Sequence, residues 1–383
     1  MPDIKTIIET ISRGTTEIIN PETLTEKLKE GRPLRVKAGF DPTAPDIHLG
    51  HVVLLRKLRQ FQDMGHEVYF LIGDFTAQVG DPTGKDSLRP KMSSKEIAEN
   101  ARTYKKQVFK VLDAKKTRIV FNSKWLAKLS AQDMLELTAY STVAQMLARA
   151  DFKKRFEDQK EISLLEFVYP LLQGYDSVYL NADIELGGSD QKFNLLMGRE
   201  LQQNFGQKPQ AVIMTPLLEG LDGVKKMSKS LDNYIGINEP PDEIFGKVMS
   251  ISDELMLRYY EILTDADLEA VKTMHPKEAK LFLAREIVKQ FYTEKEADAA
   301  KQEFERVFSR RQVPEGLAEY RISEGIPVID VLVGSGMAAS RNEARRLLKQ
   351  GAVTLDGHCI EDEDFPARPG IMKVGKRRFV KVV

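Results

Sequence analysis

Hydrophobic positions near the N-terminus follow two different spacings. Residues 3–31 place apolar side chains on recurring helical faces, which predicts amphipathic helices. Residues 34–40 form a short apolar run that predicts a strand, and a helix is predicted from Ile47 to Gly65. Residues 68–73 predict a second, buried strand. A strand, a helix and another buried strand form a βαβ unit, so the pattern indicates an α/β fold with a parallel sheet.

Later segments of the chain differ in pattern. A mainly helical block at 93–165 is predicted as an insertion into the sheet domain. Strands return at 182–186 and 211–214. Residues 242–311 are highly charged and are predicted to be all-helical, whereas 326–383 predict a short helical unit followed by a strand-rich basic end. The chain should therefore hold a sheet domain, a helical region and a small α+β unit.

Composition narrows the class of protein. The chain has 383 residues, enough for two or three domains, and 42% apolar residues, enough for a large core. Its formal net charge is zero, so any RNA contact must come from local basic patches. The single cysteine, Cys359, excludes an internal disulfide and a thiolate metal cluster and fits a reducing compartment. The polar N-terminus and the lack of a long apolar run predict a cytoplasmic protein without membrane spans.

Residues 224–230 carry three lysines and two serines between a glycine turn and a polar run that ends in two prolines. This composition predicts a solvated, mobile loop rather than part of a core. Ammonium and hydroxyl groups on such a loop are suited to closing over a polyphosphate. An ordinary charged surface turn is the alternative interpretation.

His48 and His51 mark a second candidate site at the start of the predicted helix. They are three positions apart, so both side chains lie on one face of its first turn. A helix N-terminus offers free backbone N–H groups and the positive end of the helix dipole, which suits a phosphate. Gly50 leaves room for a base or ribose, and Thr43 adds a hydroxyl nearby. The alternative is a pair of histidines without a role.

Two glycine-rich segments invite nucleotide-binding interpretations that fail. Residues 80–85 lack the glycine spacing and the Ser/Thr of a P-loop. They predict instead a tight turn that presents Asp81, with Lys85 and Arg89 available for phosphate. Residues 334–339 are similar to a dinucleotide fingerprint, but too little chain follows them for the sheet that such a site needs.

Polar side chains also mark the second half of the predicted sheet domain. Tyr169, Gln173 and Asp176 fall on one helical face, where they suit a polar small molecule or form a surface stripe. Gly188 and Asp190 follow a strand and open a helix, which is the ligand side of an α/β sheet. The glycine permits close backbone approach, and the carboxylate suits ribose hydroxyls.

A basic helical stripe lies near the C-terminus, formed by Arg341, Arg345, Arg346 and Lys349. Residues 340–383 contain ten basic and six acidic side chains. Clustering of the basic residues on one helix favours binding to an RNA backbone, and a solvated charged face is the alternative.

Together these motifs resemble those of the tyrosyl-tRNA synthetases, which are class I aminoacyl-tRNA synthetases. Residues 39–43 followed by 48–51 are similar to the family's first signature, and 226–230 match its second. Tyr169, Gln173 and Asp176, together with residues 187–191, resemble the family's amino-acid and ribose pocket. Residues 326–383 resemble the S4-type RNA-binding domain of bacterial members. The motifs keep the family's order over nearly the whole chain.

The resemblance implies an architecture and a reaction. It implies a Rossmann-like catalytic domain at 1–240, an all-helical domain at 241–318 on the anticodon side of a tRNA, and an S4-like domain at 326–383. The reaction would activate L-tyrosine with ATP, accompanied by Mg²⁺ and without a metal held by the protein, and then charge tRNA(Tyr). Family members are dimers, so a homodimer through the inserted helices at 121–165 is expected.

The resemblance also implies roles for single residues. Positive charge for the departing pyrophosphate is expected from His48, His51, Lys226, Lys229, Lys85 and Arg89. Contacts with ATP are expected from Thr43, Gly50, Gly188, Asp190, Met227, Ser228 and Lys229. Contacts with tyrosine are expected from Lys37, Gly39, Asp41, Asp81, Tyr169, Gln173, Asp176 and Gln191. Contacts with tRNA are expected from Arg341, Arg345, Arg346 and Lys349.

Two positions depart from the family's pattern. Many members carry a tyrosine where this chain has Lys37, and an amide is expected where it has Glu185. Phenol recognition would then rest on Asp176 with different help, and the role of Lys37 is open. The competing interpretations are a tryptophanyl-tRNA synthetase, another adenylate-forming ligase of the same fold, and a non-catalytic RNA-binding protein. Amino-acid-dependent pyrophosphate exchange separates them.

Overall fold

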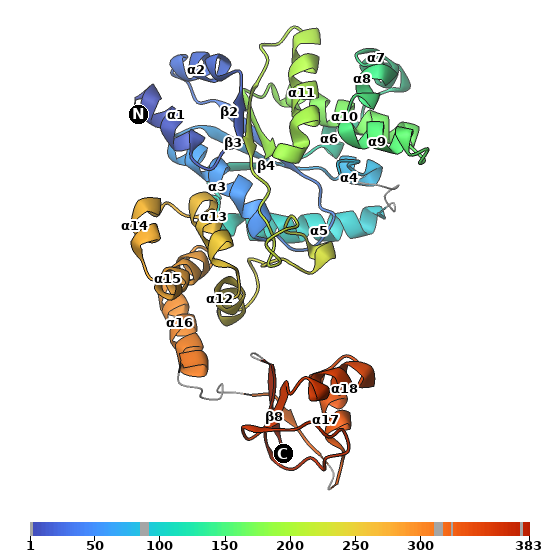
Figure 1. Cartoon of the computed structure of the whole chain (residues 1–383). Helices are drawn as coiled ribbons and strands as arrows, with labels where there is room; N and C mark the ends of the chain where they lie inside the picture. The colour runs from blue at the N-terminus through green and yellow to red at the C-terminus, as the bar shows by residue number, and fades with distance from the viewer. Residues whose placement is uncertain (1–2, 85–91, 310–316, 323–324, 376–377) are drawn as a thin grey trace. The chain divides into compact units, whose positions relative to one another are not determined.

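The computed structural model describes residues 3–84, 92–309, 317–322, 325–375 and 378–383 (Figure 1). Two of the predicted phosphate-binding residues, Lys85 and Arg89, fall outside these ranges. The chain separates into two compact units, Met1–Ala297 and Asp298–Val383. The boundary between them falls inside one helix, so the division into three domains stays a prediction.

A six-stranded sheet forms the centre of the first unit, in the order β1-β6-β5-β2-β3-β4. The strands are β1 (Glu17–Ile19), β2 (Arg35–Phe40), β3 (Glu67–Ile72), β4 (Thr117–Phe121), β5 (Ile184–Gly188) and β6 (Ala211–Thr215). Neighbouring strands are parallel, apart from β1 and β6, which are antiparallel. The predicted α/β fold with a parallel sheet is confirmed.

Helices pack against this sheet and fix where its loops emerge (Figure 1). Helix α3 (Leu49–Asp63) joins β2 to β3 and packs on β2, β3 and β5. Helix α10 (Leu164–Leu180) packs on β2, and α11 (Lys192–Asn204) packs on β5 and β6. Strand β6 is apolar except at its last position and is buried along its whole length, as expected for a strand covered on both faces. The loops that follow β2 and β5 therefore meet at the carboxyl edge of the sheet.

The first unit contains further helices, of which α12 to α15 pack mainly on one another (Figure 1). They are α1 (Ile4–Ser12), α2 (Pro21–Lys29), α4 (Thr76–Val79), α5 (Ser94–Gln107), α6 (Ser123–Leu126), α7 (Ala131–Ala139), α8 (Val143–Leu147), α9 (Ala150–Glu157), α12 (Pro241–Met249), α13 (Asp253–Leu263), α14 (Leu268–Thr273) and α15 (Pro276–Lys289). Helix α16 (Glu294–Ser309) begins in this unit and continues into the second. Among the described helices, none is long and apolar enough to cross a lipid bilayer.

Two strands were missed by the hydrophobic pattern. Strand β1 lies inside the segment 3–31, which was predicted as helices alone, and it has only three residues. Strand β4 lies inside the block 93–165, predicted as mainly helical. It is an edge strand whose residues are partly exposed, so it lacks the apolar run that marks a buried strand. The sheet thus extends into the predicted insertion, and α7 to α9 follow it.

Helices α10 and α11 cross closely because two glycines face each other. A Cβ built on Gly174 would lie 3.2 Å from the backbone nitrogen of Gly198. A Cβ on Gly198 would lie 2.8 Å from Gln210 Nε2 and 3.1 Å from Ser177 Oγ. Neither position has space for a side chain, so the two helices approach each other closely. This close approach brings polar groups of α10, α11 and the sheet into contact.

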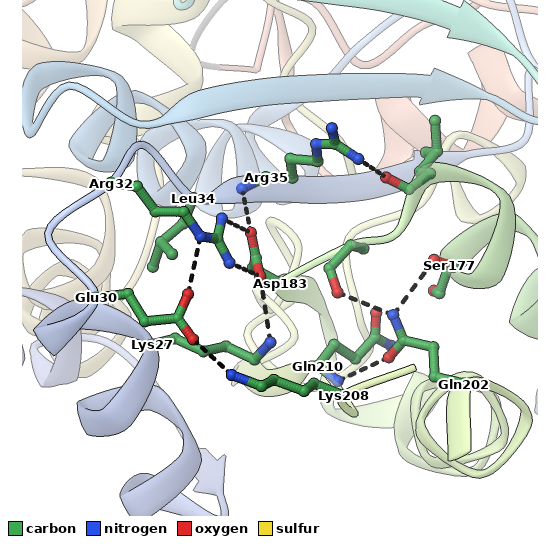
Figure 2. Close-up of polar contacts among 12 residues, drawn as sticks. Lys27, Glu30, Arg32, Leu34, Arg35, Ser177, Asp183, Gln202, Lys208 and Gln210 are labelled. Atoms are coloured by element: carbon green, nitrogen blue, oxygen red, sulfur yellow. Dashed lines mark hydrogen bonds and ion pairs between the residues drawn. The ribbon is translucent and has the colours of Figure 1, made fainter. Parts of the chain in front are cut away.

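A polar cluster at the amino end of β5 anchors the sheet to α2 (Figure 2). Arg32 donates to both carboxylate oxygens of Asp183 at 2.7 Å, and the backbone N–H of Arg35 donates at 2.9 Å. Lys27 adds a contact at 3.2 Å. Burial opposes ionisation of Asp183, but these donors together lower its pKa to about 2. In parallel α/β sheets, ligands bind at the carboxyl ends of the strands. This cluster lies at the opposite, amino end of the sheet, so we assign it a structural role.

Besides the end of α16, the described part of the second unit contains two helices and a small sheet. The helices are α17 (Val328–Gly334) and α18 (Arg341–Lys349). The sheet has the order β7-β11-β10-β8-β9, from β7 (Glu319–Tyr320), β11 (Arg378–Val382), β10 (Gly370–Val374), β8 (Val353–Leu355) and β9 (His358–Cys359). Val331, Leu348 and Met372 lie in its buried core. Residues 334–339 connect α17 to α18, so no strand precedes them as a dinucleotide fingerprint requires.

Candidate active site

The start of α3 and the chain that follows the lysine-rich segment (224–230) are joined through their backbones. The N–H of Leu49 donates to the carbonyl of Ile235 at 3.0 Å, and the N–H of Ile237 donates to the carbonyl of Ile47 at 3.0 Å. His48 is therefore paired with Gly236 in a short antiparallel bridge. Segments far apart in the sequence thus lie side by side at the carboxyl edge of the sheet.

The two histidines cap the helix that they were predicted to open. His48 Nδ1 accepts from the N–H of Gly50 at 3.1 Å, and His51 Nδ1 accepts from the N–H of His48 at 3.2 Å. Their ring centroids are 4.0 Å apart. Since both Nδ1 atoms accept, the neutral rings carry their protons on Nε2, where they can be donated to a ligand.

Burial keeps both rings neutral at physiological pH. It lowers the pKa of His48 to about 2, with a smaller contribution from His51, and lowers the pKa of His51 to about 4. The lowered pKa values favour neutral rings in the ligand-free protein, and the charge expected of these histidines at the departing pyrophosphate stays a prediction. As neutral rings they offer N–H groups for hydrogen bonds.

Gly50 is required by its neighbours. A Cβ at this position would lie 2.9 Å from His48 Cε1 and 3.7 Å from Met227 Cβ. Met227 is itself buried, at 5% exposure, although the segment 224–230 was predicted as a wholly solvated loop. Met227 therefore docks the lysine-rich segment against the start of α3.

The lysines of this segment reach carboxylates from other parts of the site. Lys226 Nζ lies 3.2 Å from Asp190 Oδ2, and Lys229 Nζ lies 2.6 Å from Asp46 Oδ2. All four side chains are at least a quarter exposed, so these ion pairs are weak and can exchange for phosphate oxygens. The ligand-free protein thus holds both ammonium groups partly neutralised.

Backbone and amide contacts shape the segment from within. The N–H of Met227 donates to the carbonyl of Leu218 at 2.7 Å, which forms one rung of a short hairpin. Asn233 Oδ1 accepts from the N–H of Ser228 at 2.8 Å, and Asn233 Nδ2 donates to Asp222 Oδ2 at 2.9 Å. Asn233 is buried and was not identified from the sequence; it fixes the loop at its centre.

The aromatic and acidic residues of the predicted amino-acid pocket are brought together. Tyr169 donates to Asp41 Oδ2 at 2.9 Å, and Thr76 donates to Asp41 Oδ1 at 2.7 Å. Burial, followed by the charge of Asp41 and then that of Asp81, raises the pKa of Tyr169, which stays a neutral donor. Gly39 lies at an exposed position of β2 beside this group. These residues form one connected site at the end of β2.

The turn after α4 contains Asp81, as predicted for residues 80–85. Asp81 Oδ1 accepts from the N–H and the hydroxyl of Thr83, and Asp81 Oδ2 accepts from Gln191 Nε2 at 2.8 Å. Arg149, at the start of α9, donates to Thr83 at 2.8 Å and to Asp151. Arg149 was missed by sequence reasoning because it lies in the helical block, far along the chain from the turn that it supports.

Asp176 is the buried carboxylate of this group, whereas Asp41 and Asp81 are partly exposed. It is 2% exposed and accepts from Trp125 Nε1 at 2.8 Å and from Asn122 Nδ2 at 3.3 Å. Burial raises the pKa of Asp176 to about 7, opposed first by the charge of Lys37 and then by these two donors. Both donors follow β4 and were missed, although Trp125 is the single tryptophan of the chain and a clear candidate for a special environment.

Lys37 is fully occupied by protein acceptors. Its ammonium lies 2.9 Å from Glu185, 2.7 Å from Ser177 Oγ and 3.3 Å from the carbonyl of Gln173. An ammonium has three N–H groups, so a direct contact with a substrate would require one of these bonds to break. Lys37 is therefore placed to act through its neighbours.

The remaining candidates lie around these groups. Thr43 donates its N–H to the carbonyl of Asp41 at 2.8 Å, which tightens the turn after β2. Gly188 lies where a Cβ would be 2.8 Å from Asp190 Oδ1, and Ser228 Oγ is 2.8 Å from Ser230 Oγ. Within the described ranges, no group of three or more His, Cys, Asp or Glu side chains is arranged to hold a metal ion.

The predicted basic stripe lies on the exposed face of α18 in the second unit. Arg341 donates to Asp330, and Arg345 donates to Glu363 at 2.5 Å. Arg346 and Lys349 are also exposed. Part of the positive charge of the stripe is thus balanced by acidic residues of the same unit.

Two family models match this chain. Residues 29–309 match the model described as tRNA synthetases class I (W and Y), and residues 327–370 match the S4 domain. A tyrosine–tRNA ligase of Desulfotalea psychrophila is 56% identical over 401 residues, which cover 100% of this chain and 99% of that relative. The tyrosine–tRNA ligase 2 of Vibrio parahaemolyticus is 54% identical over 392 residues, again with 100% and 99% covered.

Solved structures agree with the fold. The C-terminally truncated mitochondrial tyrosyl-tRNA synthetase of Aspergillus nidulans gives a TM-score of 0.67 at 23% identity, covering 79% of this chain and 94% of that one. The tyrosyl-tRNA synthetase of Archaeoglobus fulgidus, solved with L-tyrosine, gives 0.64 at 24% identity, covering 78% and 100%. At this identity the likeness concerns the fold alone.

Proposed function

Because this chain belongs to the class I tRNA synthetases (W and Y), we propose that its site activates L-tyrosine and charges a tRNA with it. It joins the tyrosine carboxylate to the α-phosphate of ATP, releases pyrophosphate, and passes the tyrosyl group to the 3′ end of the tRNA. The observation that carries this proposal is the backbone pairing of residues 47–49 with residues 235–237, which places the start of α3 beside the chain that follows the lysine-rich segment.

The first step requires positioning and charge rather than a new nucleophile. The tyrosine carboxylate is already an anion, so catalysis depends on stabilising the phosphates as their negative charge grows. Lys226 and Lys229 leave their carboxylate partners and bind the β- and γ-phosphates. His48 and His51 donate their Nε2–H groups to the same oxygens. Lys85 and Arg89 are assigned to phosphate from their sequence positions.

The nucleotide lies across the carboxyl edge of the sheet. Gly188 and Asp190 approach the ribose, and Thr43, Gly50, Met227 and Ser228 surround the base and phosphates. This arrangement is supported by the Lys226–Asp190 contact, which links the two halves of the nucleotide site. Mg²⁺ arrives on the ATP phosphates as part of that substrate.

Tyrosine binds in the pocket that ends at Asp176. The carboxylate accepts a hydrogen bond from the ring hydroxyl, while Tyr169, Gln173 and Gln191 bind the amino-acid backbone. Asp41, Asp81 and Gly39 shape the mouth of the pocket. A phenylalanine ring would leave Asp176 buried without this donor, which provides a physical basis for rejecting it.

The matching family includes enzymes for tryptophan as well as tyrosine, so the amino acid must be tested directly. The measurement is pyrophosphate exchange with each of the twenty amino acids. Exchange with tyrosine and with no other amino acid is expected. Exchange with tryptophan alone would overturn the substrate assignment, and no exchange at all would overturn the enzymatic assignment.

The tRNA is bound by the second unit and by the helices that precede it. Arg341, Arg345, Arg346 and Lys349 contact the RNA backbone, so affinity falls with added salt while exchange does not. The protein works in the cytoplasm, where ATP and tRNA are available.

A homodimer forms through the helices that follow β4. Large apolar side chains are exposed there, namely Leu135 at 72%, Val143 at 62%, Phe156 at 63% and Leu164 at 80%. Such a concentration is unusual for a monomer surface. Leu164→Asp should shift the mass measured by light scattering from dimer to monomer, and an unchanged mass would exclude this surface.

A further inference from the structure

A buried ion pair lies beside the helix that carries Asp176. Lys37 and Glu185 are 1% and 2% exposed, and their charged atoms are 2.9 Å apart. They are direct register partners on the parallel strands β2 and β5, so both side chains leave the sheet on the same face. Helix α10 contacts this face through Gln173 and Ser177, and Asp176 lies between these two residues in the sequence.

Packing fixes this pair in one arrangement. Glu185 accepts at its second oxygen from Ser177 Oγ, at 2.9 Å, and from Gln210 Nε2. A Cβ at Gly198 would lie 3.2 Å from the same oxygen, so the helix crossing leaves no space for an alternative. Buried ion pairs contribute little net stability, because removing both charges from water offsets their attraction. Stability alone therefore does not account for a charged pair at this position.

We propose that Lys37 and Glu185 act as a positioning pair for phenol recognition: Lys37 keeps Asp176 a carboxylate, and Glu185 holds Lys37 in place. The inference rests on the proposed activation of tyrosine. It explains why residue 37 has no N–H left for the substrate. Residue 37 acts through Asp176, which touches the ring hydroxyl.

The charges around Asp176 support this assignment. Burial raises its pKa to about 7, the positive charge of Lys37 is the largest opposing influence, and the negative charge of Glu185 adds a smaller increase. The phenol of Tyr169, also on α10, is a further titratable group near Asp176, and it also faces Asp41 and Asp81. Because the pKa of Asp176 lies near physiological pH, adding or removing one neighbouring charge changes how much carboxylate is present.

Trp125 provides a direct readout that does not depend on catalysis. It is the only tryptophan in the chain, and it donates to Asp176. A titration of its fluorescence against pH therefore follows protonation of that carboxyl in the substrate-free protein. Asp176→Asn is the control, because it should abolish the transition while retaining an acceptor for the indole.

Three variants test the pair: Lys37→Met, Glu185→Gln and the double variant. Lys37→Met removes the positive charge, so the fluorescence midpoint should rise. Glu185→Gln keeps a side-chain oxygen that accepts from Lys37 and so holds it in place, but it removes a negative charge, so the midpoint should fall. The double variant should lie above wild type but below Lys37→Met, because the influence of Lys37 is the larger. If Lys37→Met fails to fold, the other two variants still test the proposal. The fluorescence midpoint should lie below wild type in Glu185→Gln and above wild type in the double variant.

Tyrosine-dependent pyrophosphate exchange is the second measurement that tests the proposal. At pH 7, Lys37→Met should raise the KM for tyrosine about fivefold for the first unit by which the midpoint rises and about tenfold for each further unit, and the loss should be recovered at higher pH. The KM for ATP should change less than about twofold, since Lys37 is outside the nucleotide site. Midpoints that stay fixed, or that move in the same direction in both single variants, would overturn the proposal. Absence of exchange in the wild type would instead overturn the proposed function, and the fluorescence order would still decide the role of the pair.

Discussion

Replacing Asp183 with asparagine should destabilise the first unit at neutral pH. Its carboxylate joins the amino end of β5 to α2 by accepting from Arg32, Lys27 and the backbone of Arg35 (Figure 2). Asparagine keeps the shape of the side chain but removes the charge. Lys27, whose side chain is only 5% exposed, then loses its ionic partner in a buried position.

The magnitude follows from the lowered pKa and from the exposure of the partners. The pKa of Asp183 falls from an ordinary value of 3.8 to about 2. At about 1.4 kcal/mol per unit, this difference corresponds to roughly 2.5 kcal/mol. Because Arg32 is 45% exposed, solvent screens part of the interaction, and about 1 to 2 kcal/mol remains. The unpaired Lys27 adds a further cost, so a total loss of about 2 to 4 kcal/mol is expected.

Urea unfolding followed by Trp125 fluorescence measures this loss, since the only tryptophan lies in the first unit. The folded-state pKa of Asp183 is lowered, so its stabilising contribution is complete above pH 3.8 and is lost as the pH falls towards 2. The wild type should therefore lose stability in this range by more than Asp183→Asn does. Glu30→Gln is the matched control, because Glu30 binds the same Arg32 at the surface and should change the midpoint little.

Two results would refute this reasoning. One is a free energy of unfolding for Asp183→Asn within about 0.5 kcal/mol of wild type at pH 7.5, which is the range of an ordinary surface substitution. The other is an equal loss from Glu30→Gln, which would show that burial does not set the strength of these contacts.

Four further predictions concern the site and the tail. Lys229→Ala should lower the rate of adenylation about 100-fold in stopped-flow measurements and leave the Kd for tyrosine nearly unchanged. Asp176→Ala should lower kcat/KM for tyrosine about 100-fold or more in pyrophosphate exchange, with little change in the KM for ATP. Gly50→Ala should displace the His48 ring and lower adenylation about tenfold, since its Cβ would lie 2.9 Å from that ring. Arg346→Ala should weaken tRNA binding measured by filter retention and leave exchange unchanged.

Controls and contrary outcomes separate these assignments from general damage. Lys225→Ala removes a lysine from the same loop and should leave adenylation close to wild type. A large loss of tyrosine affinity in Lys229→Ala would contradict a role confined to the transition state. Exchange within a fewfold of wild type in Asp176→Ala would remove that residue from phenol recognition. An Arg346→Ala protein that loses exchange and tRNA binding together would indicate misfolding rather than a lost RNA contact.

The sequence was most informative where one physical signal dominates. Strands such as β6 were predicted because burial on both faces leaves an unbroken apolar run. Strand β4 was missed because it is a partly exposed edge strand, and β1 because three residues show no period. The same local pattern cannot reveal that Leu49 pairs with Ile235, since this contact depends on how the whole sheet is wound.

The sequence indicated which residue types lie in the candidate site, but it did not indicate their burial, charge or hydrogen-bond partners. The sequence placed His48 and His51 at a helix start but could not show their burial, which lowers the pKa of both rings and favours their neutral form. It marked Lys37 as unusual without showing that Glu185 is its partner, because strands β2 and β5 become neighbours only in the folded sheet. The burial and the neighbouring charges of these side chains depend on how the chain folds, so they cannot be read from single positions in the sequence.

The antiparallel bridge between residues 47–49 and 235–237 has a consequence for engineering. Main-chain atoms make this junction, so its geometry is largely independent of the chemical identity of the side chains around it. Variant libraries that change those side chains should therefore retain the spacing between the start of α3 and residues 235–237. A proline at Leu49 or Ile237 would remove an N–H from the junction and is the substitution that such libraries should omit.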